Sequence, residues 1–140
     1  MNAERCLDTN LFIYQLEARD ARKHAIADRI IRDGVATGNA CISFQIVGEC
    51  LNTVLRKAEI PLDAGGARDC LETVLAPLFR VPATLEVYQR SLDVQARHRY
   101  GFYDALVIAA ALAAGCRRLY GEDLQDGQRI EGLTIENPFN

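Results

Sequence analysis

Residues 103–115 constrain the fold more than any other part of the chain, because they are apolar almost all the way round at helical spacing. A helix without a polar face must be covered on every side, so it belongs at the centre of a domain. The uncharged stretch over 105–116 is shorter than the roughly 18 apolar residues that a membrane span needs. The segment therefore predicts a buried central helix in a layered domain.

Short apolar runs alternate with helical patterns along the rest of the chain. This alternation is typical of an α/β fold with a mainly parallel sheet of about five strands, flanked by helices on both faces. With 140 residues and no repeat or linker, the chain predicts a single domain over residues 1–140. The five expected strands cover residues 5–7, 39–42, 79–81, 118–120 and 133–135.

Helix limits follow from capping residues and glycines. Gly34 is expected to end a helix over 20–33, and Ser43 is expected to cap the next helix, which ends at Ile60-Pro61. Gly65-Gly66 opens another helix. Thr84 is expected to cap a helix that has Leu85, Tyr88, Leu92 and Ala96 on one side.

Charge and cysteine content exclude several classes of protein. Sixteen basic and nineteen acidic residues leave a formal charge of −3, which argues against binding nucleic acid by bulk positive charge. The five cysteines form no C-x-x-C pair and lie in apolar runs, so we interpret them as reduced core residues of a cytoplasmic protein rather than a zinc site. The first residues form no apolar signal region, so secretion is not expected.

Several carboxylates fall where parallel strands end. Asp8 ends the first strand, Asp123 and Asp126 follow the fourth, Asp104 begins the buried helix, and Glu49 lies in the helix after the second strand. Ligands of open parallel sheets bind outside the carboxyl ends of the strands. We therefore expect these side chains to converge on one site.

Convergence of carboxylates has an electrostatic cost. Two of them about 4 Å apart repel by roughly 4 kcal/mol at an effective dielectric constant of 20, unless a proton or cation neutralises them. Oxygen ligands without His or Cys suit Mg²⁺ or Mn²⁺. His24 and His98 adjoin no acid or hydroxyl in a nucleophilic pattern, so a Ser-His-Asp or Cys-His mechanism has little support.

Each acid also has a purely structural interpretation. Asp8 can cap the following helix. Asp104 can be an acid favoured by the helix dipole, and Glu49 can belong to an exposed helix face. The acids at 122–126 lie in a turn-like stretch, where acids are common. The hypothesis of a functional site therefore rests on the joint placement of these acids.

Four stretches of the chain, at 7–14, 43–49, 103–111 and 119–127, each carry at least one of these acids. In residues, order and spacing, from about Glu4 to Glu136, the chain resembles a PIN-domain ribonuclease, more specifically a VapC-like toxin of bacterial toxin–antitoxin pairs. The resemblance implies a three-layer PIN-like fold and a metal-dependent endoribonuclease held silent by a cognate antitoxin. It also implies a homodimer, which is common in the family.

Carried over position by position, the resemblance implies that Asp8, Glu49, Asp104 and Asp123 are catalytic and hold Mg²⁺ or Mn²⁺. Asp126 matches a further metal-binding acid that some members add. One departure is Gly121, since many relatives have Ser or Thr there, which puts a hydroxyl contact in doubt.

Candidate substrate-binding residues lie in and near these stretches: Asn10, Ser43, Arg97 and Arg99. The two arginines flank His98, just upstream of Asp104, and with Tyr100 they offer phosphate contacts and a stacking surface for unpaired bases. The alternative is that this cluster is a solvated helix end.

Two other functions stay open at this point. One is a PIN-like module that binds RNA or protein without catalysis. The other is a phospho-acceptor signalling domain, which also gathers acids and Mg²⁺ at the carboxyl ends of strands. Such domains place paired acids after the first strand and a lysine after a late one, whereas here Asp8 stands alone and no lysine follows Lys57.

Overall fold

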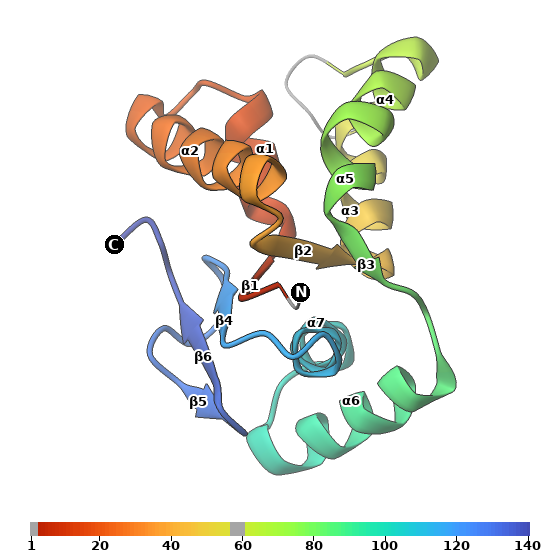
Figure 1. Cartoon of the computed structure of the whole chain (residues 1–140), viewed down its shortest axis with the longest axis vertical. Coiled ribbons are helices and arrows are strands. Elements are labelled where there is room, and N and C mark those ends of the chain that lie inside the picture. The colour runs from red at the N-terminus through yellow and green to blue at the C-terminus, as the bar shows by residue number, and fades with distance from the viewer. Residues whose placement is uncertain (1–2, 57–60) are drawn as a thin grey trace.

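The computed structural model of the chain describes residues 3–56 and 61–140. Its sheet has six strands in the order β3-β2-β1-β4-β6-β5 (Figure 1). All neighbouring strands are parallel except β5, which pairs antiparallel with β6. The strands are β1 (Arg5–Leu7), β2 (Ala40–Ser43), β3 (Phe79–Val81), β4 (Arg118–Tyr120), β5 (Arg129–Ile130) and β6 (Leu133–Glu136).

This sheet confirms the expected α/β class and the five expected strands, within a residue at their ends. The sixth strand, β5, was not expected, because two residues are too few to show a periodic pattern. It forms only through its antiparallel pairing with β6.

Helices cover the sheet on both sides: α1 and α2 pack together on one side, and α6 and α7 on the other (Figure 1). The helices are α1 (Thr9–Leu16), α2 (Ala21–Thr37), α3 (Phe44–Arg56), α4 (Ala64–Cys70), the π-helical turn η1 (Leu71–Leu75), α5 (Ala76–Leu78), α6 (Leu85–His98) and α7 (Phe102–Ala113). Throughout the part of the chain that is described, no helix is long and apolar enough to cross a membrane.

Helix α7 is the buried central helix that the sequence predicts. Every residue from Ala105 to Ala111 is buried. It packs against α6, β2 and β4, so its apolar circumference is covered on several sides. The hydrophobic core joins this helix to the sheet through residues such as Ile42, Ile108 and Leu119.

Two expected helix limits are wrong. Gly34 does not end α2: it is buried inside the helix, which continues to Gly38, a residue in the left-handed conformation (φ 73°). Ser43 does not cap α3, because its buried Oγ has no hydrogen-bond partner. The expected end of α3 at Ile60-Pro61 falls partly outside the described residues, since Ile60 lies in the gap.

One other expected limit is confirmed. Thr84 caps α6 by accepting a hydrogen bond from the backbone N–H of Val87, at 3.2 Å. The apolar side of this helix, however, faces solvent: Leu85, Tyr88 and Leu92 are exposed. The buried positions of α6 are instead Val87, Ser91 and Val94.

The cysteines are all free thiols, as expected. Four of them are buried and Cys70 is partly exposed. Cys41 and Cys116 lie side by side, with their Sγ atoms 3.6 Å apart. They act as small core residues on and beside the central strands.

Candidate active site

Asp8 stands at the centre of the candidate site, directly after β1. Its backbone N–H donates to the Tyr120 carbonyl at 2.9 Å, which continues the pairing of β1 with β4. Its side-chain Oδ1 accepts from the backbone N–H of Thr9 at 2.7 Å and so caps α1. The capping interpretation is therefore confirmed, and it does not compete with a functional one.

The electrostatics of Asp8 show which other acids lie near it. The pKa of its carboxyl is raised to about 6, chiefly by burial and also by the negative charges of Glu49, Asp104 and Asp123, although the hydrogen bond from Thr9 lowers it. Burial disfavours the charged form of a carboxyl, and nearby like charges do the same. The structure thus places Glu49, Asp104 and Asp123 near enough to the partly buried carboxyl of Asp8 for their charges to raise its pKa, and these four acids are the expected quartet.

Glu49 is held in place by two neighbours that the sequence analysis did not assign. The Thr9 hydroxyl donates to Glu49 Oε1 at 3.3 Å, and Gln45 Nε2 lies 3.4 Å from Glu49 Oε2. Gln45 Nε2 also donates to the Tyr103 carbonyl at 3.2 Å, which ties α3 to the start of α7 beside Asp104. Gln45 could have been found from the sequence, because it lies four residues before Glu49 and so on the same face of the helix.

Gly121 allows the chain after β4 to pass close to Asp8. A Cβ at this position would lie 3.2 Å from Asp8 Oδ2 and 3.3 Å from Asp8 Cβ. A serine or threonine here would require Asp8 to shift by a few tenths of an ångström. Asp123 follows two residues later and is exposed, as is Asp104.

Asp126 has its own partners away from the quartet. Its Oδ1 accepts from the backbone N–H of Asn137 at 2.8 Å, and its Oδ2 accepts from Asn140 Nδ2 at 3.1 Å. Its charge is not among those that raise the pKa of Asp8. Asp126 therefore anchors the C-terminal segment in this structure.

Glu122 also points to other partners. It accepts a hydrogen bond from the Tyr14 hydroxyl at 2.6 Å and pairs with Lys23. The contacts among Glu122, Tyr14 and Lys23 tie the loop after β4 to α1 and α2, so Glu122 stands beside the quartet rather than within it.

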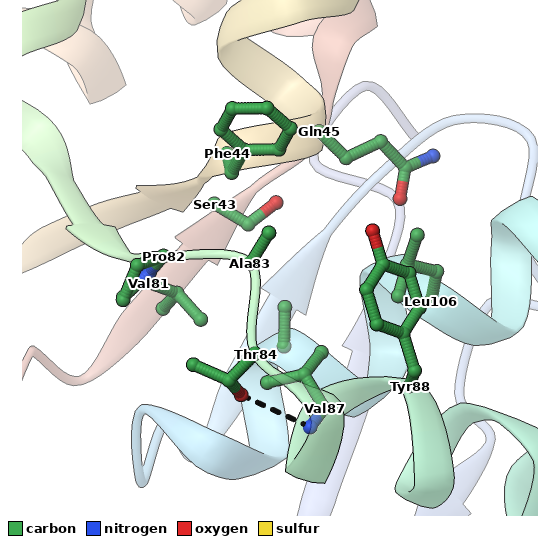
Figure 2. Close-up of a pocket in the computed structure, with 11 residues that line it drawn as sticks. Ser43, Phe44, Gln45, Val81, Pro82, Ala83, Thr84, Val87, Tyr88 and Leu106 are labelled. Atoms are coloured by element: carbon green, nitrogen blue, oxygen red, sulfur yellow. Dashed lines mark hydrogen bonds between the residues drawn. The ribbon is translucent and has the colours of Figure 1, made fainter.

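Three polar atoms near these acids are buried without a partner: Asn10 Oδ1, Ser43 Oγ and Gln45 Oε1. In native proteins most buried polar groups are hydrogen-bonded, so each of these three atoms has room for a partner such as water, an ion or a ligand. Asn10 and Ser43 were expected substrate-binding residues. Ser43 and Gln45 line a pocket together with Phe44, Tyr88 and Leu106 (Figure 2).

The arginine cluster lies at the end of α6. Arg97 is in its last turn, and Arg99 follows in the left-handed conformation (φ 60°) as the C-cap. Both are exposed, and neither forms an ion pair with an acid in the described ranges. Nearby, burial and the charge of Asp104 raise the pKa of Tyr100, against a hydrogen bond with the Gln125 backbone, so Tyr100 lies close to the acids.

The quartet fits a divalent cation by its chemistry. Four carboxylates and the raised pKa of Asp8 indicate excess negative charge, which a hard cation would neutralise. Within residues 3–56 and 61–140, no three His, Cys, Asp or Glu side chains are already drawn together closely enough to hold an ion. Of the quartet, Asp104 and Asp123 are exposed, whereas Asp8 and Glu49 are partly buried.

Comparison with known families identifies the family of the chain. The family model of the PIN domain matches residues 5–125, most of the chain and all four acids. The chain belongs to the PIN domain family. This membership replaces the interpretation as a phospho-acceptor domain. No curated protein sequence matches the chain.

Solved structures share this PIN fold over nearly their whole length at low sequence identity. A toxin–antitoxin complex from Klebsiella pneumoniae aligns with a TM-score of 0.65 and 17% identity, covering 96% of this chain and 97% of that one. VapC20 of Mycobacterium tuberculosis, a toxin that cleaves the sarcin–ricin loop, has a TM-score of 0.61 and 21% identity. That alignment covers 85% of this chain and 89% of VapC20. VapBC2 from Rickettsia felis, bound to a promoter DNA fragment, has a TM-score of 0.67 and 16% identity, and the alignment covers 95% of this chain and 97% of that one.

Proposed function

We propose that this PIN domain is a metal-dependent endoribonuclease and the toxin of a toxin–antitoxin pair. The observation that carries the proposal is the partly buried carboxyl of Asp8, whose pKa is raised by burial and by the charges of three other acids. Four carboxylates converging at the carboxyl ends of parallel strands match the expectation for a cation site in this fold.

In this proposal the quartet, which consists of Asp8, Glu49, Asp104 and Asp123, holds Mg²⁺ or Mn²⁺. Such a cation, when bound, supplies neutralising charge for the scissile phosphate and lowers the pKa of the attacking water. Asp126 is left out of this set, because both of its carboxylate oxygens already accept hydrogen bonds from the C-terminal segment.

The remaining roles belong to side chains around the quartet. Thr9 and Gln45 orient Glu49, so that its carboxylate faces the site. A carboxylate not fully committed to the cation accepts the proton of the attacking water. Asn10 and Ser43 offer unpartnered oxygens to the substrate, and Arg99 offers a phosphate contact.

An antitoxin is the expected protein partner. Two of the structural neighbours are complexes of a toxin with its antitoxin. An antitoxin arginine that enters the quartet would block cation binding. A groove between α1, α2 and η1, lined by residues such as Ile31, Val35 and Val74, is suited to an apolar helix. The free thiols fit a reducing compartment, so we propose a cytoplasmic site of action.

The direct test is incubation of the purified chain with total cellular RNA, in Mg²⁺ or Mn²⁺ and in EDTA, with mapping of the cut ends. We expect cutting only with the metal, and loss of at least about 100-fold in rate for Asp104→Asn, since a metal ligand is removed. Asp126→Asn is the matched control: it is an aspartate in the same region, and we expect it to cut normally.

Three outcomes would contradict the proposal. Cutting that persists in EDTA would rule out the mechanism. Normal cutting by a folded Asp104→Asn variant would remove the role of the quartet. RNA binding without cutting at any metal concentration would favour a PIN module without catalysis.

A further inference from the structure

The loop that carries Asp123 is fixed on both sides of that residue. Glu122, just before it, pairs with Lys23 of α2 and accepts a hydrogen bond from the Tyr14 hydroxyl of α1 at 2.6 Å. Leu124, just after it, is buried in the hydrophobic core. Asp123 itself is exposed, and its side chain has no hydrogen bond or ion pair with any residue that the structure describes. The position of Asp123 is therefore set by its two neighbours.

The partners of Glu122 belong to a group of four side chains, which we call the Lys23 cluster: Tyr14, Lys23, Glu122 and Phe139. Lys23 Nζ donates to the Tyr14 hydroxyl at 3.2 Å and lies 4.9 Å from the centre of the Tyr14 ring. The Phe139 ring meets Tyr14 edge to face, with centroids 5.0 Å apart, and Lys23 Nζ lies 5.7 Å from the centre of Phe139. The cluster thus joins α1, α2 and the C-terminal end of the chain to the Asp123 loop (Figure 1).

The Lys23 cluster holds Glu122 more firmly than an ordinary surface ion pair would. Exposed ion pairs contribute little, because water screens both charges. Here the side chains of Lys23 and Glu122 are only 24% and 22% exposed, and Phe139 beside them is 3% exposed. Hydrogen bonds to charged groups are stronger than neutral ones, and a cation near aromatic rings gains further attraction. Glu122 is therefore restrained by several contacts at once.

A fixed position for Asp123 matters because the quartet repels itself without a cation. In addition to burial, the charges of Glu49, Asp104 and Asp123 raise the pKa of Asp8, so these carboxylates are close enough to oppose one another. This repulsion favours conformations in which the exposed Asp123 moves away from the site. Contacts that keep the loop in place oppose that movement, and they reduce the ordering that cation binding would otherwise require.

We propose that Lys23 is a positioning residue of the candidate cation site: through Glu122 it holds Asp123 beside the other three acids of the quartet. The inference rests on the proposed function, since it requires that the quartet binds a cation. Loss of a group that orients a metal ligand typically lowers metal affinity by about 10–100-fold. Lys23 acts through the residue next to the ligand, so the expected loss is at the lower end, about tenfold.

Mn²⁺ binding to the whole chain, measured by electron paramagnetic resonance of the free ion, tests the proposal. Lys23→Met should raise the Kd for Mn²⁺ about tenfold. The direction is decisive, because removal of a positive charge near a cation site would by charge alone strengthen binding. Lys23→Arg, which can still pair with Glu122, should bind Mn²⁺ as the wild type does. The matched control is Arg32→Met, which removes a different ion pair of α2, with Asp28, and should leave the Kd unchanged.

Two further measurements show whether Lys23 acts through the loop. Amide hydrogen exchange of residues 121–125 in the metal-free protein should become faster in Lys23→Met and stay unchanged in Arg32→Met. Glu122→Gln alone should also weaken Mn²⁺ binding, and adding Lys23→Met to it should have little further effect, because the same contact is already lost. Thermal melts in EDTA check that every variant is folded.

The possible failures are distinguishable. If the wild-type chain binds no Mn²⁺, the cation site of the proposed function fails, and the role of Lys23 fails with it. If the wild type binds Mn²⁺ and Lys23→Met binds it equally or more tightly, only the role of Lys23 is overturned. Equal weakening in Lys23→Met and Arg32→Met would also overturn it, since a general loss of stability would then be the cause.

Discussion

At the scale of single residues, the pKa of Asp8 is subject to two opposing effects. The hydrogen bond from Thr9, which caps α1, favours the charged carboxylate, whereas burial and three neighbouring acids favour the protonated form. The second effect is larger, because the pKa is raised from 3.8 to about 6. A side chain placed only to cap a helix would show the opposite shift.

This shift predicts how the stability of the metal-free protein depends on pH. The folded state binds the Asp8 proton more tightly than the unfolded state does, so the stabilisation is present below pH 3.8 and is lost as pH rises through about 6. The loss amounts to about 3 kcal/mol of unfolding free energy. Urea unfolding between pH 4 and pH 7 measures it, with EDTA present.

Asp8→Asn is the control for that measurement. Its amide does not titrate, so the difference between variant and wild type isolates the contribution of Asp8. If the unfolding free energies of the variant and the wild type change equally with pH, Asp8 is not the group responsible.

At the scale of elements, the packing of α2 on the sheet depends on a missing side chain. A Cβ at Gly34 would lie 2.6 Å from the Cβ of Ala40 in β2, a distance too short for two methyl groups. Glycine weakens a helix interior by up to about 1 kcal/mol. Here the close approach of helix and strand outweighs that cost, and for this reason the helix continues through Gly34.

The expected result of Gly34→Ala is therefore a loss of roughly 1–3 kcal/mol in unfolding free energy, despite the better helix propensity of alanine. Gly48→Ala in α3 is a matched control, since a Cβ added at Gly48 would meet no atom within 4 Å. It should stabilise the protein by about 0.5–1 kcal/mol. Thermal or urea unfolding measures both, and a stabilised Gly34→Ala protein would contradict the close packing.

An element could be predicted where its pattern lies within a few consecutive residues, and not where it depends on contacts with other elements. The strand at 5–7 and the cap at Thr84 were correct, because an apolar run and a capping residue are readable within a few positions. Gly34 and Ser43 were assigned wrongly, since their surroundings come from other elements. The candidate quartet stays a prediction: strand ends and helix positions singled out its acids, and the resemblance to the PIN family implied the set of four.

At the scale of the whole molecule, the sheet order brings acids from four distant segments together. Asp8 follows β1 and Asp123 follows β4, and these two strands are neighbours in the sheet. Asp104 starts α7 and Glu49 lies in α3, and Gln45 links these two helices. A cation shared by the four would therefore connect the N-terminal and C-terminal parts of the chain.

We accordingly expect Mn²⁺ or Mg²⁺ to raise the melting temperature of the whole protein. At a hundredfold excess over Kd, binding contributes about 2.7 kcal/mol, or roughly 5–10 °C for a chain of this size. A thermal melt with and without Mn²⁺ measures the shift, and Asp8→Asn should abolish it while Asp126→Asn should retain it. An equal shift in all three proteins would place the ion elsewhere.

The sequence by itself determined the types of the elements, the central buried helix and the presence of acids at the strand ends, because these depend on local periodicity and capping. The tertiary structure decided which side of α6 is buried, why Gly34 is inside a helix, and how Gln45 and Asp126 are used. Each of these depends on atoms brought close by residues far along the chain, and such distances leave no mark in a local pattern.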